Sequence, residues 1–153
     1  MADVTATWQW YPRGLLNVSK GNLGVTGVTA SLKIALYHSN SNAYSGYETL
    51  DKKSALTGTV SGGNYADGTC SSIVATLDTT ANTVELRFGD SITFGTTVTA
   101  SAKFAVLYKD DANDYVVAYM RFPSVISADA GSITMNQNDS DNAAVTISYT
   151  QLT

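Results

Sequence analysis

One stretch of the sequence, from Thr99 to Phe122, constrains the fold more than any other. It reads as two largely apolar strands joined by a polar linker at 109–114. That linker is rich in Asp and Asn, which satisfy their own backbone in turns. Because successive side chains of a strand point to opposite faces, both strands present apolar groups on both faces. The stretch therefore predicts a buried hairpin at the centre of a β domain.

Strict alternation also assigns the side chains of this hairpin to its two faces. Since both faces are apolar, each of them needs a cover built from other parts of the chain. On the first strand we expect Phe104, Val106 and Tyr108 to share one face and Ala105 and Leu107 the other; on the second, Val116, Ala118, Met120 and Phe122 should alternate with Val117, Tyr119 and Arg121.

Short alternating apolar segments recur along the rest of the chain, with turn residues between them. This pattern is typical of antiparallel sandwiches and barrels. Long helical patterns do not alternate with the strands, which argues against an α/β fold. We therefore expect an all-β fold, an antiparallel β-sandwich or barrel of jelly-roll type, with at most one short helix. The further strands are expected at 31–38, 57–60, 70–78, 83–88, 92–94, 132–136 and 144–149, the helix at 47–56, and a loop at 123–131.

Residues 1–30 are expected to form an extended N-terminal arm with short extended pieces, ahead of a single β domain over 31–153. Glycines recur at irregular spacing in the second half of the arm, and Pro12 keeps its predecessor extended. Trp8 and Trp10, two residues apart, would share a face of an extended segment. Two interpretations stay open: these indoles anchor a partner chain, or the arm folds back and caps its own core. The candidate interface residues are Trp8, Trp10, Tyr11, Pro12, Leu15 and Leu16.

Composition narrows the classes of partner. The chain has 153 residues, a usual size for one domain, and only 14% of them are charged, against about a quarter in an average soluble protein. Either partner chains cover much of the surface, or Ser, Thr, Asn and Gly supply its polarity. The net charge of −4 and the scattered Lys and Arg argue against nucleic-acid binding. No apolar run approaches the length of a membrane span, and the N-terminus lacks a signal-peptide pattern, so we expect folding in a cytoplasm.

The residues that usually carry chemistry are few. One histidine, His38, and one cysteine, Cys70, cannot build a zinc site, and Cys70 is expected to be a buried apolar thiol. There is no G-x-S-x-G turn to position a serine nucleophile and no phosphate-binding loop. We therefore expect no catalytic residues, no cofactor and no metal site.

Two acidic clusters are the remaining metal candidates. Asp110, Asp111 and Asp114 form one, and Asp139 and Asp141 form the other. Clustered carboxylates are what calcium requires, but Asp is also an ordinary turn residue and neither cluster has the EF-hand spacing. The interpretation as solvated turns is therefore favoured.

Three tyrosines in predicted loops, Tyr44, Tyr47 and Tyr65, are candidates for stacking on sugars. Filling the rim of the core is the more common role of a tyrosine. A carbohydrate-binding β-sandwich module therefore stays as an alternative function.

Six short motifs follow one another between residues 10 and 136. They are an aromatic-Pro-x-Gly-Leu segment, an alternating strand, a Gly-x-Tyr turn, a Gly-Asp-Ser-Ile-Thr-Phe stretch, a hairpin whose second strand ends in an aromatic residue, and a closing Gly-x-Ile-Thr strand. Their order resembles small tailed-bacteriophage virion proteins of the capsid decoration (cement) type, although the Gly-x-Tyr turn lacks a second glycine pair and the last strand region is longer. The motifs lie at Trp10–Leu15, Leu32–Leu36, Gly63–Gly68, Gly89–Phe94, Ala105–Lys109 with Phe122, and Gly131–Met135.

The resemblance implies a non-enzymatic structural protein that binds and stabilises the lattice of the major capsid protein. It also implies a place on the capsid exterior of a virion assembled in the host cytoplasm, and a homo-oligomer, a trimer, because capsid lattices offer local threefold sites. The alternatives within a virion are a neck, tail or fibre component. Deleting residues 1–12 is expected to weaken capsid binding and to leave the fold intact.

Overall fold

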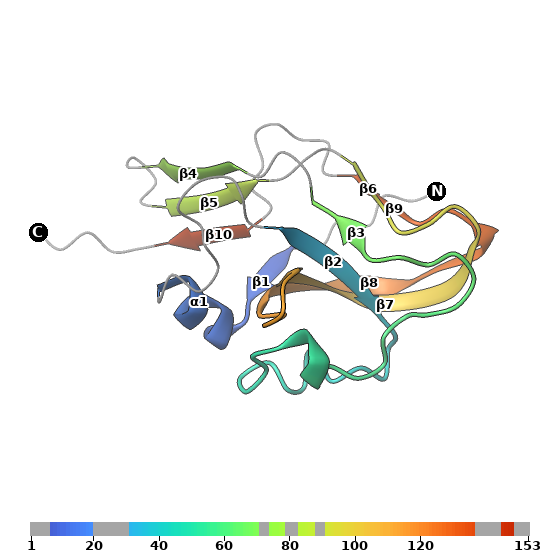
Figure 1. Cartoon of the computed structure of the whole chain (residues 1–153), viewed down its shortest axis with the longest axis horizontal. Coiled ribbons are helices and arrows are strands. Elements are labelled where there is room, and N and C mark those ends of the chain that lie inside the picture. The colour runs from blue at the N-terminus through green and yellow to red at the C-terminus, as the bar shows by residue number, and fades with distance from the viewer. Residues whose placement is uncertain are drawn as a thin grey trace, which may run out of the picture.

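The computed structural model describes residues 7–19, 31–70, 74–78, 83–87, 91–136 and 145–148. The predicted all-β class with antiparallel pairing is confirmed, and closure into a sandwich or barrel stays a prediction. No helix in these ranges is long and apolar enough to span a membrane. The elements are β1 (Trp8–Trp10), α1 (Pro12–Ser19), β2 (Leu32–Tyr37), the 3₁₀ helix η1 (Lys53–Ala55), β3 (Gly68–Thr69), β4 (Val74–Asp78), β5 (Thr83–Arg87), β6 (Ser91–Thr93), β7 (Val98–Lys109), β8 (Val116–Gly131), β9 (Thr134–Asn136) and β10 (Val145–Ser148) (Figure 1).

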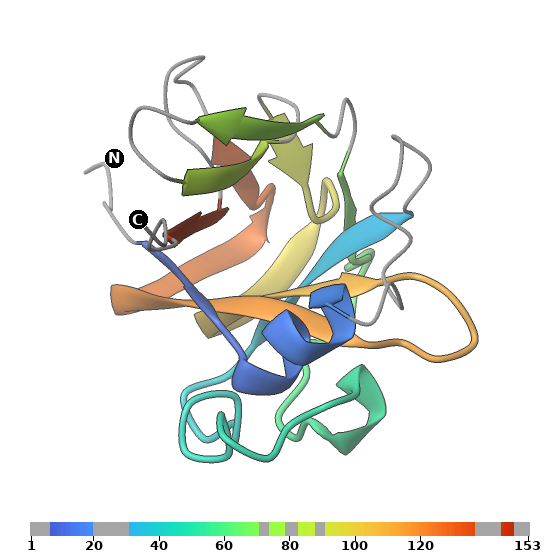
Figure 2. The ribbon, with the colours of Figure 1, turned by 90° about the vertical axis from the view of Figure 1, so that its left-hand side faces the viewer.

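The main sheet has five strands in the order β1-β8-β7-β2-β3, so the predicted hairpin β7–β8 has a neighbouring strand on each side. A three-stranded sheet, β10-β5-β4, and the pair β6-β9 are separate from it. Figure 2 shows β4 and β5 above the main sheet, and α1 together with the loop 39–56 below it. Both faces of the hairpin are covered, as its double-sided apolar pattern requires: Ile92, Phe94 and Ile133 pack in the first core, and Tyr11 and Leu50 pack in the second.

Two hydrophobic cores lie against the hairpin, and alternation along β7 and β2 divides residues between them. The predicted faces of the first hairpin strand are confirmed, since Ala105 and Leu107 enter the first core and Phe104, Val106 and Tyr108 the second. The first core comprises Leu32, Ile34, Leu36, Val60, Cys70, Ile92, Phe94, Val98, Ala102, Ala105, Leu107, Val117, Ala118, Met120, Phe122 and Ile133. The second comprises Tyr11, Ala35, Tyr37, Ala43, Leu50, Leu56, Phe104, Val106, Tyr108, Val116 and Tyr119.

A β-bulge interrupts the alternation of β8. Leu107 lies opposite Ala118 and the next residue, Tyr108, lies opposite Val116, so Val117 is an extra residue on β8. An extra residue shifts the side chains on its two sides relative to one another. Val116 therefore faces the second core while Ala118 faces the first, and the predicted grouping of these two on one face is wrong.

The bulge is also where the N-terminal segment attaches. β1 pairs with β8 over Ala118–Met120, and the Tyr11 N–H then donates to the Val117 carbonyl oxygen at 3.1 Å. The helix α1 starts at Pro12, whose constrained φ and missing N–H suit the first helical position. A Cβ on Gly14 would lie 2.3 Å from the Val117 oxygen, so glycine lets the helix approach β8 this closely.

Residues 8–19 therefore differ from the expected arm. The extended piece is present at Trp8–Trp10, but it is a strand of the main sheet, and Pro12–Ser19 is a helix where we expected loose chain. The physical reason is that the bulged β8 strand offers both an edge for pairing and a carbonyl for the start of the helix.

Other boundaries also shift. The expected helix at 47–56 is a series of turns followed by the three-residue η1. The expected loop at 123–131 is instead the second half of β8. The pairing of β8 with β7 is interrupted after Arg121 and resumes at Ile126. Pro123 lies within the interrupted part, where its missing N–H removes no ladder hydrogen bond. The expected strand at 70–78 appears as β4 with β3 just before that range, and residues 71–73 lie outside the described ranges.

Replacing Gly14 with Ala should destabilise the protein by about 2 kcal/mol, since α1 or β8 must move to admit the methyl group. The matched control is Gly131→Ala, whose Cβ would meet no atom closer than 3.8 Å. Urea denaturation monitored by circular dichroism measures the free energy of unfolding of each variant. Equal stability of the two variants would contradict the close approach of α1 to the bulge.

Candidate functional site

The structure separates the six candidate interface residues into two groups. Trp8 and Trp10 are half-buried against the first core, and Tyr11 is fully buried in the second. The indoles pack against the first core, as the interpretation of a segment that caps its own core expects, and contact of their exposed parts with a partner chain stays a prediction. The exposed members are Pro12, Leu15 and Leu16; whether they contact a partner stays a prediction.

This arrangement also corrects the expectation that residues 1–12 can be deleted without harm to the fold. Deletion would remove β1 from the main sheet and Tyr11 from the second core. The Tyr11 hydroxyl further donates to the Ala43 carbonyl at 2.9 Å, which ties the segment to the loop 39–56. A large buried aromatic of this kind stabilises a fold by about 3–5 kcal/mol, so the deletion would change folding and binding together.

Two of the three candidate sugar-stacking tyrosines lie together at the surface. Tyr44 is 48% and Tyr47 37% exposed, and their rings stack with centroids 6.5 Å apart and planes at 20°. The Arg121 guanidinium lies 5.2 Å from the centroid of the Tyr44 ring, and the Tyr47 hydroxyl donates to Glu48 at 3.1 Å. We call Tyr44, Tyr47, Glu48 and Arg121 the tyrosine patch.

The patch is held by the structure beneath it. Tyr119, a buried residue of the second core, packs edge-on against Tyr44 with ring centroids 6.2 Å apart. Its own hydroxyl donates to Gln9 Oε1 of β1 at 2.6 Å. The loop carrying Tyr44 and Tyr47 is closed by the N–H groups of Gly46 and Leu50, and Leu50 is buried. The exposed rings are therefore positioned before any partner arrives.

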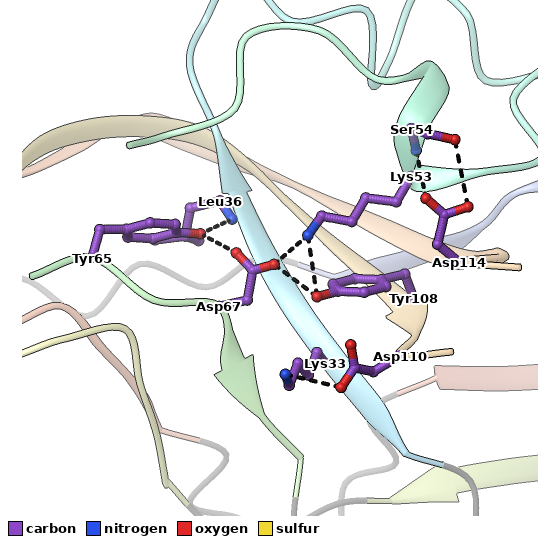
Figure 3. Close-up of polar contacts among 9 residues, drawn as sticks. All are labelled: Lys33, Leu36, Lys53, Ser54, Tyr65, Asp67, Tyr108, Asp110 and Asp114. Atoms are coloured by element: carbon purple, nitrogen blue, oxygen red, sulfur yellow. Dashed lines mark hydrogen bonds and ion pairs between the residues drawn. The ribbon is translucent and has the colours of Figure 1, made fainter. Parts of the chain in front are cut away.

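Tyr65, the third candidate, belongs to a different cluster (Figure 3). Its ring stacks on Phe94 at 3° and a centroid distance of 6.5 Å. Its hydroxyl donates to Asp67 Oδ1 at 3.0 Å and accepts the Leu36 N–H at 2.7 Å. Tyr65 is thus engaged within the fold and does not join the other two tyrosines.

Lys53 and Tyr108 complete this cluster on the other oxygen of Asp67. Lys53 Nζ forms an ion pair with Asp67 Oδ2, lies 3.2 Å from the Tyr108 hydroxyl and sits 4.3 Å from that ring's centroid. The Tyr108 hydroxyl donates to Asp67 Oδ2 at 2.7 Å. We call Lys53, Tyr65, Asp67 and Tyr108 the Asp67 network; none of its connections was visible in the sequence.

The electrostatics of the Asp67 network favour a structural role. Desolvation by burial raises the pKa of both Tyr65 and Tyr108, and the charge of Asp67 adds to the rise. Both hydroxyls therefore stay protonated and donate to the carboxylate, whose two oxygens are occupied. The Asp67 carboxylate thus holds one lysine and two phenols together in a partly buried position. The network instead ties η1 and the 62–68 loop to β2 and β7.

The first acidic cluster behaves as a set of turn residues. Asp110 pairs with Lys33 at 2.9 Å and Asp111 with Lys109 at 2.7 Å, while Asp114 accepts an N–H of η1 at 2.9 Å. The hydrogen bond from Lys109 is the main cause that lowers the pKa of Asp111. Asp111 Oδ1 also accepts the N–H groups of Asn113 and Asp114, which is the turn chemistry that the sequence predicted.

The remaining candidates can be placed briefly. Cys70 is buried, which confirms the predicted buried thiol, and this burial raises the pKa of the thiol to about 12, which disfavours the reactive thiolate. His38 follows β2 and is half-buried. Within the described ranges, no three His, Cys, Asp or Glu side chains are grouped to hold a metal ion. Asp139 and Asp141 lie outside the described residues.

Comparisons of the chain with protein-family models, with curated proteins and with solved structures gave no match. The likeness to capsid decoration proteins therefore rests on the motifs in the sequence.

Replacing Tyr65 with Phe should lower the free energy of unfolding by about 1–3 kcal/mol, because the Leu36 N–H loses its acceptor and Asp67 a donor. The control is Tyr115→Phe, because that hydroxyl has no hydrogen bond to another residue among those the structure describes. Chemical denaturation of both variants at neutral pH gives the comparison. A Tyr65→Phe variant as stable as the control would mean that the network contributes little to stability.

Proposed function

We propose that the chain is a non-enzymatic structural protein of a bacteriophage virion, a capsid decoration protein that binds the major capsid protein from outside. The order of the six motifs along residues 10–136 supports this class. The low charge content of 14% supports it too, since the cores of protein interfaces are depleted of charge. A trimer at a local threefold site of the lattice belongs to the same proposal.

The observation that carries the proposal is the exposed apolar surface of α1. Leu15 and Leu16 are 36% and 44% exposed, side by side on one short helix, with the exposed Pro12 preceding them. A single exposed leucine is ordinary, but adjacent ones that no other part of the described chain covers are typical of contact sites.

The helix is rigidly attached, which matters for binding. Tyr11 and Gly14 fix its start on the Val117 bulge, and the Asn17 side-chain amide donates to Asp51 Oδ1 at 2.8 Å. A preformed helix loses little conformational freedom when a partner covers it. α1 is therefore suited to seat the protein on a large, repetitive surface.

The first test is the copy number of the chain in purified virions, measured by quantitative mass spectrometry against the major capsid protein. A decoration protein should be present at a ratio comparable to that of the capsid protein. A ratio of a few copies per particle would move the chain to the neck, tail or fibre. Absence from particles would overturn the proposal.

The double variant Leu15→Ser/Leu16→Ser should bind capsids of the same phage, assembled without this chain, about tenfold more weakly or worse, because apolar contact area is lost. The matched control is Val125→Ser, an equally exposed apolar residue on β8. Cosedimentation with capsids measures binding, and circular dichroism verifies the fold. Equal binding of both variants would exclude α1 from the contact.

A further inference from the structure

We propose that the tyrosine patch joins two copies of this chain through a twofold contact in which Arg121 of one copy faces Glu48 of the other. The contact is separate from α1 and does not depend on the proposed capsid function. It accounts for an exposed aromatic and charged surface that no part of the described chain covers.

The chemistry of the patch is that of a protein contact. Tyrosine and arginine dominate the energetics of interfaces, because they combine large apolar area with directional polar groups. Tyr44 and Tyr47 are the most exposed aromatic side chains among the large apolar residues of the described surface. Tyr119 and Arg121 hold the Tyr44 ring in place, so little ordering is needed on association.

The charges of the patch are the second observation. The described surface pairs Lys33, Lys53 and Lys109 with aspartates. Arg121 and Glu48 are both exposed and, like Arg13 and Asp129, form no ion pair with another described residue. The patch therefore carries one cation and one anion beside its stacked tyrosines, and neither charge has an opposite charge as partner.

A surface with both charges is complementary to itself. A twofold axis brings the same surface of two copies together, so residue i meets residue j and residue j meets residue i. Arg121 would meet Glu48 of the partner subunit twice, and the planar guanidinium matches a carboxylate well. These pairs offset the repulsion between two chains of net charge −4.

A sugar is a weaker fit to the same surface. A pyranose ring stacks on the open face of an aromatic side chain, whereas Arg121 lies over the ring of Tyr44 and Tyr47 stacks beside it. An uncharged sugar would also leave the unpaired Arg121 and Glu48 unexplained.

The test is a charge exchange on the full chain in solution, without capsids. Sedimentation equilibrium at rising protein concentration should show a monomer–dimer equilibrium for the wild type. Arg121→Glu and Glu48→Arg should each raise the dimer dissociation constant about tenfold or more, because like charges then face one another. The double variant Glu48→Arg/Arg121→Glu should restore the dimer.

The control is Arg13→Glu, which makes the same charge change at an exposed position on α1 and should leave the dimer intact. If Arg121→Glu fails to fold by circular dichroism, Arg121→Gln removes the charge at similar length and should also weaken the dimer. A monomeric or trimeric wild type, single variants that dimerise normally, or no rescue in the double variant would each overturn the twofold contact. Loss of tyrosine fluorescence on titration with host polysaccharide, without dimers, would assign the patch to a glycan instead. A trimeric wild type would at the same time favour the trimer of the proposed function over the twofold contact. Capsid binding itself is tested separately, by the variants of α1.

Discussion

The burial of the β7–β8 hairpin on both faces is the constraint on which the rest of the structure depends. Two apolar faces require two covers, and the chain supplies them from widely separated segments. On one side Ile92 and Phe94 come from the region of β6, and on the other Tyr11, Ala43 and Leu50 come from the start of α1 and the loop 39–56. Both exposed surfaces to which we assign contacts belong to the second cover, so the same packing that closes a core also positions the candidate sites.

The Val117 bulge links the hairpin to that second cover. By adding one residue it turns Val116 toward the second core and leaves the Val117 carbonyl available to the Tyr11 N–H. Pairing of β1, the start of α1 and the close approach of Gly14 all converge on this one peptide. A local irregularity in pairing therefore determines where Leu15 and Leu16 are presented.

The sequence predicted the features that arise from local alternation and missed those that arise from distant contacts. The hairpin and its β7 faces follow from the pattern itself, whereas the bulge at Val117 depends on how the opposite strand is paired. The helix α1 holds a glycine and a β-branched residue and is stabilised by contacts with β8 and Asp51; Pro12 at its first position was the available signal. Pro123 wrongly indicated a turn, because it lies in the part of β8 where the pairing with β7 is interrupted, and the strand continues beyond it.

The candidate sites divide in the same way. The sequence identifies Tyr44 and Tyr47 as aromatic residues in a polar loop. It does not predict that Arg121, on a strand far along the chain, lies close to Tyr44. In the Asp67 network, Lys53 and Tyr108 are separated from Asp67 by 14 and 41 positions in the sequence. The alternation of apolar and polar residues does not predict such distant pairs. In the first acidic cluster the predicted turn chemistry accounts for Asp111, whose hydrogen bonds from Asn113 and Asp114 are short-range in sequence. The partners of Asp110 and Asp114 lie far away in the sequence and were not predicted.

The location of β1 has a consequence for spectroscopy. Both tryptophans of the chain lie on this three-residue strand, which forms one end of the five-stranded sheet. Intrinsic indole emission from the protein therefore reports the docking of one strand onto β8, and the far-ultraviolet dichroism reports the sheets as a whole. If the two signals change at different points during unfolding, the N-terminal strand is released separately from the unfolding of the hairpin core. If the two signals coincide, the strand and the core unfold as one cooperative unit joined at the bulge.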